Sequence, residues 1–400
     1  MRELRAGWAK REITPAPGYA MGGYIARSAP AVGAFDPLYI RVLLLEQGTT
    51  RLLMVLADVL LISSRWAEHL RREIARALGT RPAFIIIAAT HTHSGPILDT
   101  HPFNFSGDVS EPYLRQYSEK LEQAMIETSL TASNRLCSVS ASFARVEIAG
   151  VATDRNSPQR ARRQSLFLFK FEAVKDIALL AVYGCHPTVL GPDNHALSGD
   201  LHGSLSTIWE GKAAIALVAN GAAANISTRF IRKEQTSKEL KRLASKITRQ
   251  AAAARFQPIT LSPFKAQLRT VVLPLADLSM AVPLKHPRSR RKAAVAEEAI
   301  HVRAHISRAA EFMRPTLALS ITEWRWGPIR LAALPLEIYS ETGMFLWRHA
   351  HTIPVCYANG YWGYLTAASA ARNDYEALSS PFSRAADAIL RRSLCCRETR

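Results

Sequence analysis

The sequence predicts an α/β fold in which a mixed, layered β-sheet core is flanked by helices and a candidate active site lies on loops at strand ends. Over residues 1–150, short apolar runs rich in β-branched residues alternate with segments of helical periodicity, which is typical of α/β layer folds. Several runs end in loops containing Gly, Pro, His, Asn or Asp, and α/β folds place functional side chains on such loops. The 400 residues can bury a substantial core, and we expect one domain over residues 1–400.

The first part of the chain alternates predicted strands and helices. The helix at 63–79 is the best defined, because Leu70, Ile74 and Ala77 repeat at helical spacing on one face. This range starts at a serine cap and stops at Gly79, as is typical of helix boundaries. In chain order the expected elements are strands 38–46 and 51–61, helix 63–79, strand 83–90 and a helix over roughly 111–127.

The second part of the chain continues this alternation with one interruption. Residues 256–290 are rich in proline and are expected to be irregular, so that 256–313 is a candidate subdomain excursion. The other expected elements are strands 165–172, 177–184 and 214–220, a basic amphipathic helix at 236–254, a helix at 291–313, strands 317–326 and 329–337, and a C-terminal helix from 383.

The chain is strongly basic, with a formal net charge of +18 and a pI near 10.0. Nucleic acid, an anionic membrane surface and an acidic substrate all suit such a charge. The basic residues gather at 160–163, 232–249, 285–292 and in the last ten residues. No aromatic residues interleave them in a single-strand-binding pattern, so we do not expect nucleic acid as a partner. We expect a solvated basic face that can make peripheral contact with an anionic membrane.

The sequence contains no recognisable secretion signal or membrane span. Residues 1–15 carry charges but no apolar core of a secretory signal. The apolar run at 51–61 is interrupted by Asp58 and is too short to cross a bilayer. The five cysteines are an odd number without zinc-type spacing. We therefore expect a reduced, cytoplasmic protein.

Two histidines follow the predicted strand 83–90. His91 and His93 are two positions apart, so they project to the same side if the strand continues through them. Two imidazoles at the carboxyl end of a strand are well placed for a metal ion or an acid/base pair. A pair of hydrogen-bonded loop histidines is the alternative interpretation.

Further polar side chains follow other predicted strands. His186 ends one strand and is followed by a loop with Asp193, His195, Asp200 and His202. A zinc site with two histidines would still need a carboxylate or similar ligand and an open position for water. The remaining strand ends offer Asn225 and Ser227 after the small residues 221–224, then Glu337, then Tyr364 and Tyr375 in a loop rich in Gly and Tyr. Five such junctions suggest one shared rim.

Taken together, these motifs resemble the catalytic N-terminal domain of the neutral, non-lysosomal ceramidase family. The most specific segment is AATHTHSGP at 88–96. The other similar segments occur in the family's order, at 6–27, 185–203, 220–229, 334–343 and 359–366. The resemblance covers nearly the whole chain, but the family's C-terminal immunoglobulin-like domain is not expected within these 400 residues.

The resemblance implies a zinc-dependent hydrolase of an N-acyl amide, with ceramide or another lipid or small-molecule amide as substrate. It implies Zn²⁺ bound by His91, His186, Glu337 and Tyr364. It also implies that His93 lies beside the ligands or acts as an acid/base group, that Arg155 and Tyr375 lie near the substrate, and that Ser227 matches a serine for which a nucleophilic role has been suggested.

The chain departs from the family pattern around that serine. Ceramidases carry Gly-Asp-Val-Ser-Pro, whereas Ala224, Asn225 and Thr228 replace its Gly, Asp and Pro here. We therefore prefer a zinc-hydroxide mechanism to a serine nucleophile.

Alternative functions remain at this point. The His-x-His pattern also occurs in metallo-β-lactamase-like sheets and amidohydrolase barrels, but the Asp-His of the former is missing and the further ligands of the latter cannot be aligned. A non-ceramide metallo-amidase or esterase is the closest alternative. A non-catalytic basic protein that binds lipid or nucleic acid on a degraded hydrolase fold is another.

Overall fold

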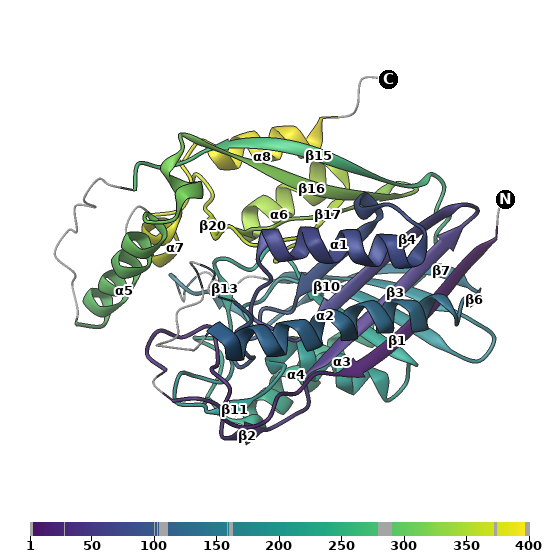
Figure 1. Cartoon of the computed structure of the whole chain (residues 1–400), viewed down its shortest axis with the longest axis horizontal. Coiled ribbons are helices and arrows are strands. Elements are labelled where there is room, and N and C mark those ends of the chain that lie inside the picture. Colours follow the sequence, from purple (N-terminus) through teal and green to yellow (C-terminus); the bar gives the residue numbers. More distant parts are fainter. Residues whose placement is uncertain are drawn as a thin grey trace.

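The computed structural model describes residues 3–27, 29–99, 101, 103, 111–157, 159, 163–278, 290–371 and 374–396. Within them, two five-stranded sheets stack face to face, and helices cover their outer faces (Figure 1). One sheet has the order β5 (Ile85–Ala89), β4 (Thr50–Ala57), β3 (Tyr39–Gln47), β1 (Leu4–Glu12), β6 (Cys137–Ser138). The other has the order β12 (Ile215–Asn220), β10 (Ile177–Tyr183), β9 (Gln164–Glu172), β7 (Ser140–Ile148), β14 (Gln257–Pro258).

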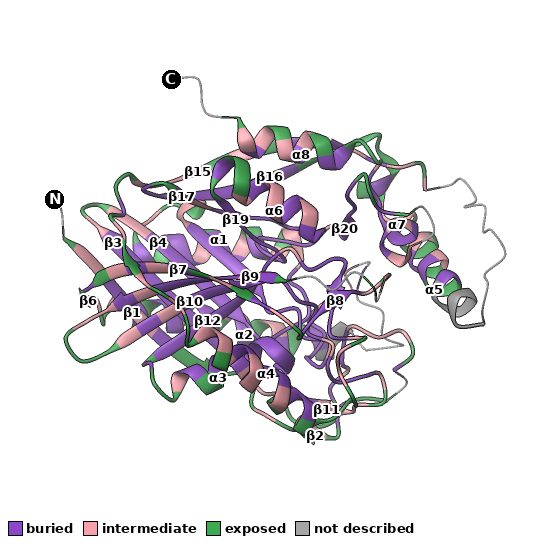
Figure 2. Ribbon diagram, turned by 180° about the vertical axis from the view of Figure 1, so that it is seen from behind, coloured by how far each residue is buried: buried purple, intermediate pink, exposed green. Residues whose placement is uncertain are grey.

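The central strands β4, β5, β10 and β12 are almost continuously apolar because both of their faces are buried. In β3, Val42 and Leu44 face α1 (Ser64–Leu78) and α2 (Glu111–Ser133), whereas Leu43 and Leu45 face the second sheet. Helices α3 (Asp200–Glu210) and α4 (Ser237–Ala251) cover the other side of that second sheet. The central strands are accordingly buried along their length in Figure 2. This arrangement confirms the predicted α/β fold with a mixed sheet core flanked by helices.

A third sheet completes the core. It has the order β15 (Phe264–Pro274), β16 (Thr316–Trp326), β17 (Ile329–Ala333), β19 (Thr352–Val355), and α6 (Ser340–Ala350) and α8 (Ala386–Cys395) pack on it. Helices α5 (Arg290–Ile306) and α7 (Tyr375–Ser379) pack together beside it (Figure 1). Three short pairs join the loops: β2 (Gly33–Ala34) with β11 (Ala196–Leu197), β8 (Thr153–Asp154) with β13 (Ile226–Ser227), and β18 (Glu337–Ile338) with β20 (Tyr364–Leu365).

The expectation that residues 256–290 are irregular is wrong over β15. This strand pairs with β16 in register from Phe264 to Pro274. Proline misled the prediction because Pro263 and Pro274 flank the strand or end it, where a missing amide proton costs little. Residues 279–289 of the predicted irregular segment lie outside the described residues.

Other boundaries differ from the sequence prediction. Helix α5 ends at Ile306, and a short 3₁₀ turn at Ala310–Met313 follows, so the predicted helix at 291–313 is divided. Strand β4 ends at Ala57, and residues 58–61 form a loop instead of continuing the strand. Strands β1 and β7 and helices α3 and α6 were not predicted from the sequence. None of the described helices combines the length and the apolar character that a membrane crossing requires.

Three parallel strand pairs determine where the functional loops lie. Strand β4 pairs in parallel with β5, β10 with β12, and β17 with β19. The carboxyl ends of parallel strands lie at the same edge of a sheet, which is where α/β folds place their sites. The loops that carry His91, His186 and Glu337 all leave such ends.

Candidate metal centre

His91 and His93 meet although the strand does not continue through them. Strand β5 ends at Ala89, and His91 has a left-handed backbone with φ +64°. Its amide donates to the carbonyl of Val59, in the loop after β4. The two imidazole rings lie 4.8 Å apart between centroids and nearly perpendicular. The turn, rather than strand periodicity, therefore brings the two rings together.

Three histidines direct their Nε2 atoms toward one point, because their Nδ1 atoms are engaged elsewhere. The Nδ1 atoms of His91, His93 and His186 lie 2.8, 2.8 and 3.1 Å from the backbone carbonyls of Leu60, Gly23 and Ala223. A carbonyl oxygen can only accept, so each Nδ1 carries the proton and each neutral ring has an unprotonated Nε2. Possible ligand atoms of the three rings lie within 4.8 Å of one another. His91 and His186 are buried, whereas His93 is half-buried.

These Nε2 atoms fit a bound cation. His91 Nε2 and His93 Nε2 lie 3.2 Å apart, and His186 Nε2 is buried without a hydrogen-bond partner. Burial lowers the pKa of His91 and His186 well below the usual histidine value, and lowers the pKa of His93 to about 3. Neutral rings whose lone pairs face one another repel unless a positive ion lies between them. A metal ion at this point would remove the repulsion, and the backbone carbonyls orient the rings, as is usual for histidine ligands.

Glu337 adds a carboxylate to the same point. It begins β18, and its oxygens lie 3.5 Å from His91 Nε2 and 3.3 Å from His186 Nε2. Tyr357 donates to Glu337 Oε2 at 3.1 Å, and Tyr361 donates to Oε1. Burial raises the pKa of Glu337 to about 7, against the opposite effect of these hydrogen bonds and of Arg155. Two imidazoles and a carboxylate are a ligand set that zinc accepts.

Arg155 lies beside this cluster and is held by a buried carboxylate. Its Nε donates to Glu376 Oε1, and its Nη2 donates to the hydroxyl of Tyr364 at 3.0 Å. The guanidinium carbon lies 5.4 and 5.8 Å from the ring centroids of Tyr364 and Tyr375. Glu376 also accepts from Asn156 and Tyr339, and it is fully buried. The Coulombic attraction of Glu376 keeps the pKa of Arg155 high despite its burial.

Tyr364 and Tyr375 are close to the histidines. Tyr364 pairs with Glu337 in the short β18–β20 ladder, and its ring lies parallel to that of His186, with centroids 6.5 Å apart. Tyr375 begins α7 and packs its ring edge-on against Tyr364. The placement of Tyr364 is compatible with the predicted ligand role, which stays a prediction.

Ser227 lies next to His186 in the backbone. It belongs to β13 and forms a bridge with His186, and its buried hydroxyl accepts from the amide of Arg229 at 3.3 Å. The neighbouring Asn225 donates to Asp154 and Glu341 and accepts from the Ser340 amide. Asn225 therefore ties the loop after β12 to the start of α6.

The other polar residues of the 183–203 loop do not join the cluster. His202 lies in α3, and its Nε2 donates to the carbonyl of Tyr183 at 3.0 Å. Asp200 accepts from the amides of Val189, Leu190 and Leu201, which closes the loop. His195 contacts the carbonyl of Ala29 at 3.3 Å. These contacts indicate structural roles.

Sequence reasoning missed several residues of the site. Tyr357 and Tyr361 precede the predicted Tyr364 in the same loop, and their spacing was a usable signal. Glu376 directly follows the predicted Tyr375. Gly23 was detectable only in the structure: it has φ +98°, and a Cβ there would lie 2.6 Å from the ring of His93.

Comparison with known proteins shows the family of the chain. The family model for the N-terminal part of neutral/alkaline non-lysosomal ceramidases matches residues 4–230, which is more than half of the chain. The chain belongs to this ceramidase family. The match includes His91, His93, Arg155, His186 and Ser227, whereas Glu337, Tyr364 and Tyr375 lie beyond it.

Solved structures support the ceramidase fold over the whole chain. Neutral ceramidase from Pseudomonas aeruginosa superposes with a TM-score of 0.74 at 19% identity, covering 99% of this chain and 74% of that one. A ceramidase complexed with C2 gives a TM-score of 0.72 at 19% identity with the same coverage. Among curated proteins, none matches this sequence. The ceramidase fold therefore extends past the matched segment to the loops that carry Glu337 and Tyr364.

Proposed function

We propose that this protein is a zinc-dependent hydrolase that cleaves a linear N-acyl amide, such as ceramide or another N-acyl lipid, into a fatty acid and an amine. The convergence of three histidine Nε2 atoms with the carboxylate of Glu337 carries this proposal. Membership of the ceramidase family supports the choice of an amide as the bond that is cleaved.

Within this proposal, His91, His186 and Glu337 hold the metal, and Tyr364 is the predicted fourth ligand. When bound, zinc polarises a carbonyl and lowers the pKa of a coordinated water to about 7 in favourable sites. His91 and His186 are buried and carry carbonyl-fixed Nδ1 protons, so both direct an unprotonated Nε2 toward the Glu337 carboxylate, where the metal would be held. Tyr357 and Tyr361 fix the carboxylate of Glu337 and keep it from rotating away.

Arg155 supplies a donor for the amide oxygen. Amide hydrolysis develops negative charge on that oxygen, and one well-placed donor contributes roughly 3 to 4 kcal/mol to the stability of the transition state. The guanidinium of Arg155 is held by Glu376 and already donates to the Tyr364 hydroxyl. It is therefore held in place beside the predicted ligand Tyr364 and does not have to reorganise.

His93 transfers the proton. It is the least buried of the three histidines, which places it on the solvent side of the cluster. Water adds to the carbonyl carbon, the carbon–nitrogen bond breaks, and the proton removed from water is delivered to the leaving nitrogen. We assign the attack to water rather than to Ser227, because the Ser227 hydroxyl is buried and occupied by the Arg229 amide.

A substrate screen tests this function. Purified protein is supplied with zinc and assayed on N-acyl amides of varied acyl length, with sphingoid-base, amino-acid and simple amine head groups, and on matching esters. We expect release of fatty acid from at least one amide and its loss in Glu337→Ala, with Glu68→Ala as an exposed-carboxylate control. Cleavage of esters alone would favour the esterase alternative. A fully zinc-loaded wild type without any hydrolysis would favour a binding protein.

A further inference from the structure

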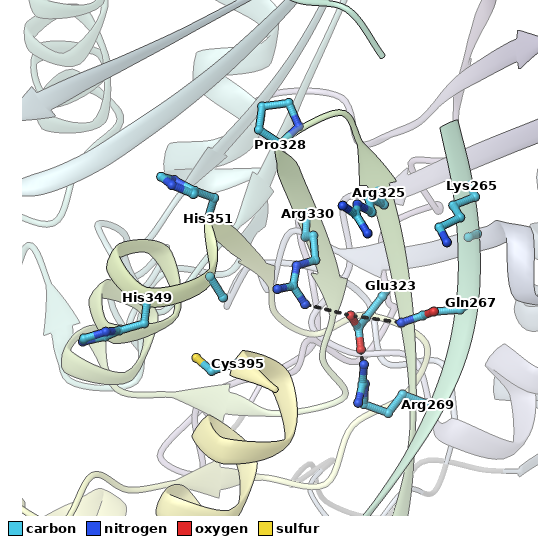
Figure 3. A pocket seen from close by; sticks show the side chains of 12 residues that line it. Lys265, Gln267, Arg269, Glu323, Arg325, Pro328, Arg330, His349, His351 and Cys395 are labelled. Atoms are coloured by element: carbon cyan, nitrogen blue, oxygen red, sulfur yellow. Dashed lines mark hydrogen bonds and ion pairs between the residues drawn. The ribbon is translucent and has the colours of Figure 1, made fainter. Parts of the chain in front are cut away.

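A cavity lies at the opposite end of the third sheet from the metal centre. It has a volume of about 790 Å³ and opens on β15, β16 and β17, with the end of α6 and the last turn of α8 as its walls (Figure 3). Arg330 lies near the start of β17, whereas Glu337 follows the end of that strand. His351, which precedes β19, lines the cavity, whereas Tyr357, which follows β19, donates to Glu337. The two sites are therefore separate.

The mouth of the cavity holds a row of positive charges. Lys265 on β15 is paired in register with Arg325 on β16, and Arg325 is paired with Arg330 on β17. The three residues thus stand side by side across three strands, and all line the cavity. Like charges directly opposite each other in a sheet are destabilising. This row costs stability unless something negative compensates it.

One carboxylate compensates only part of this charge. Glu323 lies at the base of the cavity and is nearly fully buried. It accepts from Arg269, lies 3.8 Å from Arg330 and accepts from Gln267 at 3.5 Å (Figure 3). Neither Lys265 nor Arg325 has a carboxylate partner in the part of the chain that the structure describes.

We call the cavity lined by Lys265, Arg269, Glu323, Arg325 and Arg330 the basic cavity. We propose that the basic cavity binds a small phosphate-bearing anion. Planar guanidinium groups bind phosphate oxygens through paired hydrogen bonds, and three of the lining residues are arginines. The described lining contains no Phe, Tyr or Trp on which a base could stack, so the phosphate, and not a nucleobase, is the recognised group. The volume lies within the range of small-molecule sites.

The phosphate group that the basic cavity recognises occurs in two kinds of molecule, a soluble polyphosphate and a lipid head group with a terminal phosphate. Pyrophosphate represents the former. Phosphatidic acid in phosphatidylcholine vesicles represents the latter, with phosphatidylserine as a lipid that is anionic but has no terminal phosphate. The proposal does not depend on the hydrolase activity, so its failure leaves the proposed function untouched.

Calorimetric titration and vesicle co-sedimentation at fixed ionic strength test the proposal. The test variant is Lys265→Gln/Arg325→Gln, because both residues are exposed and neither contacts Glu323. The control variant Lys238→Gln/Lys241→Gln removes the same charge from exposed positions of α4. We expect the test variant to bind pyrophosphate or phosphatidic acid vesicles at least about tenfold more weakly than wild type, and the control to bind like wild type.

A melting curve without ligand gives a second readout. It distinguishes loss of the binding site from loss of folding, because a poorly folded variant would have a lower Tm. Removing the like-charge row should raise the Tm of the test variant, by about 1 to 2 °C. Pyrophosphate should raise the Tm of wild type and leave that of the test variant unchanged. Equal binding by wild type and test variant overturns the proposal, as does equal loss in the control. Binding of a mixed-sequence oligonucleotide in place of both phosphate probes also overturns it.

Discussion

The Nε2 atom of His186 lies 3.3 Å from Oε2 of Glu337 and has no hydrogen-bond partner. A neutral imidazole nitrogen and a carboxylate oxygen are both acceptors, so their close approach requires a shared cation or proton between them. Burial lowers the pKa of His186, which disfavours a proton on the ring. This relationship makes metal content the most direct prediction from the structure.

His186→Ala and Glu337→Gln should each weaken zinc binding by roughly ten- to hundredfold or more. The measurement is zinc per chain by mass spectrometry after dialysis, with His195→Ala on the same loop as the control. A chelator should lower the Tm of wild type and leave that of His186→Ala nearly unchanged, because a ligand that binds only the folded state stabilises it. Undiminished zinc in both ligand variants would contradict the site.

Gly23→Ala should displace His93 while leaving the proposed metal ligands His91, His186 and Glu337 in place. The new Cβ would lie 2.6 Å from the His93 ring, and φ at this position is +98°. We expect hydrolysis of the best substrate to fall by about a hundredfold, with zinc content retained. Gly33→Ala is the matched control, because nothing lies within 4 Å of its added Cβ. Full activity of Gly23→Ala would argue against a role for His93.

Glu376→Gln should destabilise the fold and lower activity together. It leaves the buried Arg155 guanidinium without its carboxylate partner, and breaking a buried pair costs about 3 kcal/mol or more. Denaturant unfolding measures the first effect, and kcat/KM the second. Glu68→Gln breaks an exposed pair with Arg72 and should cost less than about 0.5 kcal/mol. Equal effects of the two substitutions would show that Glu376 does not stabilise Arg155 through its charge.

Asp36→Asn should change how stability depends on pH. Burial raises the pKa of Asp36 from 3.8 to about 6, although Ser198 and Gly199 donate to its carboxylate. The folded state therefore binds a proton more tightly than the unfolded state. The contribution of Asp36 to stability is complete below pH 4 and is lost as pH rises through about 6.

Because Asn does not titrate, the stability of the variant does not fall in this way as the pH rises. The free energy of unfolding of Asp36→Asn minus that of wild type should rise by roughly 1 to 3 kcal/mol across this interval. Urea unfolding at a series of pH values measures the difference. A difference that stays constant over the series would mean that Asp36 has an ordinary pKa in the folded protein.

Much of the layered core followed from the sequence because its strands are buried on both faces. The runs that became β3, β4, β5, β10 and β12 are almost continuously apolar, which is typical of strands that are covered on both faces. The missed strands β1 and β7 carry polar residues on one face, so they lacked this signal. The long strand β15 was missed because flanking prolines were interpreted as a sign of irregular structure.

The candidate site was predicted less completely from the sequence than the core was. The histidines and Glu337 were found because each follows an apolar run and matches a family motif. Their convergence was an expectation that depends on parallel pairing of strands far apart in sequence. Tyr357 and Tyr361 share the Gly- and Tyr-rich loop of Tyr364 but were not singled out, and Glu376 carries no motif of its own. Only their contacts with Glu337 and Arg155 reveal that these residues belong to the site.

The sequence by itself determined the layered α/β architecture and the family, because periodicity, apolar runs and short motifs are local properties of the chain. The tertiary structure decided which ring nitrogens face one another. That outcome depends on the left-handed turn at His91, on the carbonyls of Leu60, Gly23 and Ala223, and on the close approach of Gly23 to His93. The tertiary structure also aligns Lys265, Arg325 and Arg330 in one row. Strand register sets such contacts, and register is a property of paired segments that neither segment encodes alone.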